Sequence, residues 1–114
     1  MKHQEDNLQE SIVRYFKLAY PKYLIFAVPN GGNRNTREGA RFKRQGVLAG
    51  VSDLIVVMPN RVLFIELKWG KNKQQSSQKK FQSIIESLEH EYYVVYSIDE
   101  FINLMKIITK TKKQ

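Results

Sequence analysis

The sequence contains no cysteine and only two histidines, His3 and His90. The lack of cysteine excludes disulfide bonds, thiolate zinc sites and cysteine nucleophiles, and two histidines are too few for a histidine-rich metal cluster. Long apolar runs are also missing, because none approaches the roughly 18 residues that a membrane-spanning helix needs. The polar N-terminus does not have the pattern of a secretory signal. We therefore expect a soluble cytoplasmic protein without a membrane partner.

Acidic residues are scarce relative to basic ones. The 114 residues include 11 Asp and Glu but 19 Lys and Arg, which gives a net charge of +8. Fourteen of the basic residues fall in three stretches, Arg34–Arg44, Lys68–Lys80 and Lys106–Lys113. Such clusters favour a polyanionic partner, most simply nucleic acid. We interpret the two internal stretches as phosphate contacts and residues 110–114 as a solvated basic tail.

A chain of this length fits one compact domain, which we place at residues 1–109, before the tail at 110–114. The hydrophobic periodicity predicts helices over residues 4–19, 36–45 and 77–90 and from 97 onward, and strands over residues 23–28, 53–58, 62–68 and 92–96. We expect Ser76 or Ser77 to cap the third helix. Its predicted inward stripe is Phe81, Ile84, Ile85 and Leu88. The order α-β-α-β-β-α-β-α indicates an α/β fold, a mixed sheet flanked by helices.

Two acidic residues, Asp53 and Glu66, accompany the central strands. Alternation along a strand places Glu66 and Lys68 on one face and Leu67 on the other. A four-residue turn around Pro59 and Asn60 would form a hairpin that brings Asp53 opposite Glu66.

Two carboxylates, a carbonyl and water suit a hard cation such as Mg²⁺ or Mn²⁺. A neighbouring lysine can assist a water molecule or stabilise charge on a phosphate under attack. This layout indicates a divalent-metal phosphodiesterase site. The alternative is a turn acid and a cross-strand ion pair on a solvated face.

The segments Gly50-Val51-Ser52-Asp53 and Ile65-Glu66-Leu67-Lys68, followed by Gln78 at a helix start, resemble the PD-(D/E)XK nuclease superfamily. Pro29-Asn30-Gly31-Gly32 with Arg34, and Gly46-Val47 before Gly50, are similar to the VRR-NUC family of virus-type replication-repair nucleases, especially its small stand-alone phage and prophage members. The resemblance extends from about Glu5 to Phe101. Ser52 stands where the superfamily name records a proline, a change that removes a backbone restraint but no ligand.

This resemblance implies a restriction-endonuclease-like core and assigns roles to particular positions. Asp53, Glu66 and the backbone carbonyl of Leu67 match metal ligands, Lys68 matches the catalytic lysine, and Gln78 matches the glutamine after the strand. The family's first helix also supplies an acid, for which Glu5 is the candidate metal ligand and catalytic residue. Gln78 has the alternative role of starting its helix.

The resemblance further implies a Mg²⁺- or Mn²⁺-dependent DNA endonuclease that hydrolyses phosphodiester bonds by in-line attack of a metal-activated water. It suggests branched DNA such as Holliday junctions, a homodimer, and a bacterial cytoplasm, with the chain encoded by the cell or by a phage or prophage. One alternative is a non-catalytic nucleic-acid-binding module with a nuclease-like fold. The intact set of Asp53, Glu66 and Lys68 argues against it. Another alternative is a basic protein with an acidic protein partner and no metal dependence.

Several further residues are candidates for DNA contact. They are Asn30, Arg34, Arg37, Arg41, Lys43, Arg44, Lys71, Lys73 and Lys79. A solvated basic face is the alternative interpretation. Trp69, the only tryptophan, stacks on an unpaired base, wedges a distorted duplex or packs as a rim residue on the following helix. Tyr92, Tyr93 and Tyr96 are interpreted as strand residues without a function.

Overall fold

The computed structural model describes residues 3–29 and 36–110, apart from the side chain of Thr36. Its elements are α1 (Gln4–Ala19), β1 (Leu24–Ala27), α2 (Thr36–Arg44), β2 (Leu54–Met58), β3 (Arg61–Leu67), α3 (Ser76–Ser87), β4 (Glu91–Val95) and α4 (Ile98–Lys110). The predicted α/β class and the order α-β-α-β-β-α-β-α are confirmed. The tail beyond Lys110 lies outside the described residues, so its boundary stays a prediction.

One four-stranded sheet has the order β1-β2-β3-β4. The first two pairings are antiparallel and the third, β3 with β4, is parallel. Met58 pairs with Arg61 across the hairpin turn, where Asn60 takes the left-handed φ of 59° that such a tight turn requires. The parallel pair needs a crossover, which α3 provides. Three strands are therefore antiparallel in chain order, with a hairpin between β2 and β3, and the crossover helix α3 places β4 parallel to β3.

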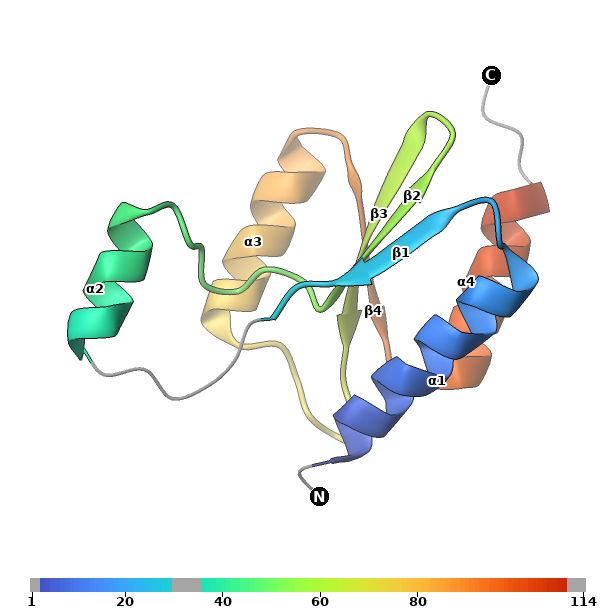
Figure 1. The fold of residues 1–114 in the computed structure, drawn as a ribbon, viewed down its shortest axis with the longest axis horizontal. Helices are drawn as coiled ribbons and strands as arrows, with labels where there is room; N and C mark the ends of the chain where they lie inside the picture. Colours follow the sequence, from blue (N-terminus) through green and yellow to red (C-terminus); the bar gives the residue numbers. More distant parts are fainter. Residues whose placement is uncertain (1–2, 30–35, 111–114) are drawn as a thin grey trace.

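Helices cover both faces of this sheet. Figure 1 shows α1 and α4 together on one side of the strands and α3 on the other. The main core, between the sheet and the helices α1 and α4, consists of Leu8, Ile12, Phe16, Ile25, Leu54, Val56, Leu63, Ile65, Leu67, Val95, Phe101, Met105 and Ile108. Burial of each such side chain stabilises the fold by on the order of 2 kcal/mol. This core fixes the face of β3 that turns away from α3.

The opposite face has a smaller apolar cluster under α3. Phe81 and Ile85 pack there against Tyr92, with Phe64 and Val94 alongside. The predicted inward stripe of this helix is wrong in part, because Ile84 is 43% exposed and Leu88 is 62% exposed. The helix covers mainly β4, so only a narrow stripe is buried, and it ends at Ser87 rather than at residue 90. Space on this face is thereby left for polar side chains at the end of β3.

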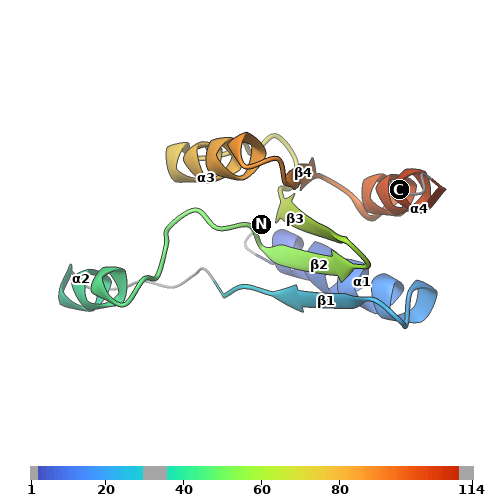
Figure 2. The ribbon, with the colours of Figure 1, turned by 90° about the horizontal axis from the view of Figure 1, so that it is seen from above.

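Helix α2 stands apart from the sheet (Figures 1 and 2). Gly46 ends the segment with a φ of 94°, and the Val47 N–H donates to the Phe42 carbonyl at 2.9 Å. Its charged residues Arg37, Arg41, Lys43 and Arg44 are exposed. None of the helices in the described ranges has both the length and the apolar content to cross a membrane.

Candidate active site

Glu66 and Lys68 lie at the end of β3, on the face that α3 partly covers. Both are buried, with 1% and 6% of their surface exposed. The Lys68 N–H donates to the Val95 carbonyl at 3.0 Å, which extends the parallel pairing past the strand. The Lys68 Nζ atom lies 3.8 Å from Glu66 Oε2. The predicted shared face of these two side chains is confirmed.

Asp53 is held next to them by the backbone of two strands. Its Oδ2 atom accepts a hydrogen bond of 2.7 Å from the Leu67 N–H. Its carbonyl accepts one of 2.9 Å from the Val28 N–H, beyond the end of β1. The preceding Ser52 is buried, and its hydroxyl donates to the Leu54 carbonyl at 3.3 Å. The hairpin therefore brings Asp53 opposite Glu66, as the sequence predicted.

Gln78 connects the start of α3 to this pair. Its Nε2 donates to Glu66 Oε2 at 2.7 Å, and its Oε1 accepts the Gln75 N–H at 2.8 Å. One amide thus holds Glu66 and supports the start of the helix, and a catalytic role for Gln78 stays a prediction. Gln75 is the N-cap, so the expected capping by Ser76 or Ser77 is wrong. The reciprocal contact with Gln78 three residues later favours the earlier start.

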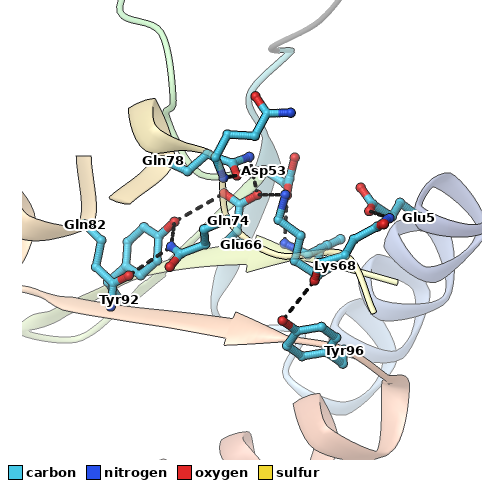
Figure 3. Close-up of polar contacts among 12 residues, drawn as sticks. Glu5, Asp53, Glu66, Lys68, Gln74, Gln78, Gln82, Tyr92 and Tyr96 are labelled. Carbon is cyan, nitrogen blue, oxygen red and sulfur yellow. Dashed lines mark hydrogen bonds and ion pairs between the residues drawn. The ribbon is translucent and has the colours of Figure 1, made fainter. Parts of the chain in front are cut away.

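Tyr92 is a member of the site that the sequence did not reveal. Its hydroxyl donates to Glu66 Oε1 at 3.2 Å, so Tyr92 and Gln78 bind different oxygens of one carboxylate (Figure 3). Gln74 Nε2 in turn donates to the Tyr92 hydroxyl at 3.3 Å and to Gln82 Oε1 at 2.9 Å. Residue alternation puts Tyr92 and Val94 on one face, but only the parallel register of Val94 with Glu66 shows which face.

The two carboxylates are electrostatically unbalanced. Burial and then the negative charge of Asp53 raise the pKa of Glu66 to about 8, although Lys68 lowers it. Burial also raises the pKa of Asp53, against the effect of its hydrogen bond from Leu67. Burial and the charge of Glu66 raise the pKa of Tyr92, so its hydroxyl stays protonated and can donate. One lysine does not compensate the buried Glu66 and the half-buried Asp53 when both are ionised, and the site therefore favours additional positive charge.

Glu5 lies at the rim of the site, on the first turn of α1 (Figure 3). Its Oε2 accepts a hydrogen bond of 3.4 Å from Asn72 Nδ2, and its charge makes a smaller contribution to the raised pKa of Asp53. Within the described ranges, no three acidic or histidine side chains are gathered closely enough to hold a metal ion. Asp53 and Glu66 thus form the close pair, and a ligand role for Glu5 and for the Leu67 carbonyl stays a prediction.

A cavity of about 280 Å³ opens beside Asp53. Gly50 and Asp53 line it from the loop before β2, and Ser77 and Gln78 line it from the start of α3. Gly50 has a φ of 86°, and a Cβ atom there would come within 2.3 Å of the Ser77 carbonyl oxygen. The missing side chain therefore lets the loop pass directly against α3. Asp53 and Gln78 therefore line the same cavity, which we call the hollow.

The predicted DNA contacts divide into two groups around this hollow. Arg37, Arg41, Lys43 and Arg44 are exposed on α2. Lys71, Lys73 and Lys79 are exposed between β3 and the first turns of α3. Asn30 and Arg34 lie outside the described residues. Their contact with DNA stays a prediction for all nine residues.

No family model and no curated protein sequence matches the chain. A solved structure described as "VRR_NUC domain protein" superposes on it with a TM-score of 0.75 and 26% sequence identity, over 93% of this chain and 88% of that chain. The likeness extends over nearly the whole chain. The chain thus has a nuclease-like fold that is similar to that of this VRR-NUC domain protein.

Proposed function

We propose that this chain is a DNA endonuclease that depends on Mg²⁺ or Mn²⁺ and hydrolyses phosphodiester bonds. One observation carries the proposal. On a nuclease-like fold, the half-buried Asp53 and the buried Glu66 form a pair of carboxyl groups with too little positive charge, beside the single ammonium group of Lys68. A basic, DNA-related protein of this family would use such a pair to bind a divalent cation.

The donor set fits a hard cation. Both side chains offer carboxylate oxygens, which Mg²⁺ and Mn²⁺ prefer. Hydrogen bonds from the Leu67 N–H to Asp53 and from Gln78 and Tyr92 to Glu66 fix the orientation of the two groups. The Leu67 carbonyl, Glu5 and water would complete the ligand set. When bound, the cation would supply Lewis acidity toward a phosphoryl oxygen and charge that allows both carboxylates to ionise.

The protein's own residues perform the remaining steps. Lys68, held 3.8 Å from Glu66, orients the attacking water and stabilises negative charge that develops on the phosphate. Tyr92 and Gln78 keep Glu66 in a single orientation before the substrate binds. The hollow beside Asp53 admits the phosphate from the solvent side.

The exposed basic residues on α2 and after β3 bind the DNA backbone on either side of the hollow. Selectivity for branched DNA and assembly as a homodimer, with one site for each strand, extend the proposal from the family. A bacterial cytoplasmic location and a phage or prophage origin stay predictions.

The test is cleavage of labelled four-way junction, flap and linear duplex DNA in Mg²⁺, Mn²⁺ or EDTA. We expect cutting with either metal that EDTA abolishes and that Asp53→Asn and Lys68→Ala both lose. Lys106→Ala, an exposed basic residue on α4, is the matched control and retains cutting. No cleavage of any DNA by the native protein, with salt-sensitive binding intact, would replace this proposal by a non-catalytic binding module.

A further inference from the structure

A second cavity adjoins the site on the side of α1 and α4. It has a volume of about 390 Å³, within the range of small-ligand sites. Its lining residues are Gln4, Asn7, Leu8, Ser11, Trp69, Ser97 and Ile98. We call it the Trp69 cavity. The tryptophan itself is 40% exposed, so a large part of the indole is accessible to a ligand.

The position of this cavity relates it directly to the carboxylate pair. Trp69 follows Lys68 in the chain, and Gln4 precedes Glu5. Figure 3 shows Glu5 and Gln78 on opposite sides of Lys68. The hollow at Asp53 and Gln78 and the Trp69 cavity therefore flank the pair, one toward α3 and the other toward α1.

Trp69 is held in place by local backbone contacts. The Asn72 N–H donates to the Trp69 carbonyl at 3.1 Å and closes a turn in which Gly70 takes a φ of 61°. The Tyr96 hydroxyl donates to the Asn72 carbonyl at 3.1 Å, which ties this turn to the end of β4. The indole thus extends from an anchored backbone turn.

The chemistry of the cavity suits a flat aromatic ligand with polar edges. The indole offers a stacking face, Leu8 and Ile98 add apolar contacts, and Gln4 and Asn7 carry amides that can bond to a base edge. The exposed Lys71 and Lys73 follow Trp69 and offer charge for the adjoining phosphates. A base in a duplex keeps both its partner and its stacked neighbours, so a single-base cavity requires an unpaired nucleotide.

We propose that the Trp69 cavity binds an unpaired nucleobase next to the phosphodiester that is cut at Asp53 and Glu66. The proposal rests on the proposed function, which it deepens by naming the substrate class. Substrates with a single-stranded nucleotide beside the cut are bound through stacking on Trp69. Fully paired DNA lacks this contact.

Because Trp69 is the only tryptophan, its fluorescence reports on this cavity alone. The first experiment titrates the native protein in EDTA with a short single-stranded oligonucleotide, with an abasic strand of the same length and charge, and with a duplex. We expect quenching by the first strand and little quenching by the other two. Equal quenching by the abasic strand, or none by any strand, would overturn the proposal.

The second experiment measures the ratio of flap to linear-duplex cleavage. Stacking on one aromatic residue contributes roughly 5- to 150-fold to the binding of a base. Trp69→Ala should therefore lower the ratio by about 10-fold, and Trp69→Phe should keep most of it. Leu88→Ala, which removes an exposed apolar side chain at the end of α3, is the control. An unchanged ratio in Trp69→Ala would overturn the inference but leave the nuclease proposal standing. Quenching without cleavage of any DNA would overturn the nuclease proposal but leave base binding by the Trp69 cavity standing.

Discussion

Strands β3 and β4 carry a charged cluster at each end, and the two clusters differ in how their charges are balanced. At one end, Arg61 donates from Nε and Nη2 to both carboxylate oxygens of Glu91, the latter at 2.9 Å. The Tyr93 hydroxyl donates to the same carboxylate at 2.6 Å, and Arg61 Nη1 reaches the Ile108 carbonyl at 3.3 Å. At the other end lie Asp53 and Glu66 with Lys68.

The difference separates a structural cluster from a functional one. One acid and one base satisfy each other at Arg61 and Glu91, and the hydrogen bonds that the guanidinium donates to Glu91 raise the pKa of Arg61. Two acids share one base at the other end, where the pKa of Glu66 reaches about 8. A fold that only needed a strand end would gain by replacing Glu66 with an apolar residue. The buried carboxyl group of Glu66 is therefore the group for which we propose a bound cation.

The largest expected effect comes from neutralising a carboxylate of the unbalanced cluster. Glu66→Gln and Asp53→Asn should each lower metal-dependent cleavage on the order of 100-fold or more, the loss seen when a transition-state contact is removed. Unfolding in EDTA above pH 8, where Glu66 is ionised, should show equal or greater stability, because one of two neighbouring negative charges is gone. Normal cleavage by either variant, or a loss of cleavage that is explained by unfolding of the variant, would contradict the functional assignment.

Breaking the balanced cluster should have the opposite profile. Arg61→Ala leaves Glu91 without its partner, and we expect a loss on the order of 3 kcal/mol in the free energy of unfolding. Denaturant titration measures this loss, and cleavage per folded molecule should change little. The double variant Arg61→Met, Glu91→Leu serves as the control and should recover much of the stability. An Arg61→Ala protein as stable as the native one would refute the structural role.

The raised pKa of Glu66 should make the free energy of unfolding depend on pH. The folded pKa of Glu66 is about 8, above its reference value of 4.5. The folded state therefore binds a proton more tightly than the unfolded state, and this contribution to stability is complete below about pH 4.5 and is lost as pH rises toward 8. Denaturation in EDTA at several pH values should show this decline in the native protein. The decline should be absent in Glu66→Gln, and a decline of equal size in that variant would assign it to other groups.

The smallest expected effect is that of Tyr92→Phe. It removes the hydroxyl that donates to Glu66 and costs about 1 kcal/mol of stability. The pKa of Glu66 should rise because one contact that favours the carboxylate is lost. The proton release on metal binding, followed by calorimetry, detects this shift. Tyr96→Phe, which removes a hydroxyl that donates to the Asn72 carbonyl, is the matched control.

Local signals were sufficient for much of the fold and for half of the site. The stripe of Leu8, Ile12 and Phe16 and the nearby Pro21 predicted α1 from residue 4 to residue 19, which the structure confirms. Strand alternation placed Glu66 beside Lys68. A short turn set the register that brings Asp53 opposite Glu66. These features depend on residues close in sequence, so their geometry follows from the chain itself.

The rest depends on contacts that the sequence does not encode locally. The link between Tyr92 and Glu66 needs the parallel register of β4, which is set only when α3 has packed. The exposure of Ile84 and Leu88 follows from how little of the sheet α3 covers. The Trp69 cavity likewise joins α1, α4 and the loop after β3.

Binding of a divalent cation by Asp53 and Glu66 is tested most directly by calorimetric titration of the metal-free protein with Mn²⁺ at pH 7, in two buffers of different ionisation enthalpy. Glu66 is largely protonated at this pH, so binding should release about one proton per cation. Glu66→Gln should bind more weakly and release fewer protons. Saturable binding with this proton release is the predicted result. Absence of Mn²⁺ binding would show that Asp53 and Glu66 do not bind a divalent cation. Binding of equal strength and proton release in Glu66→Gln would show the same for Glu66.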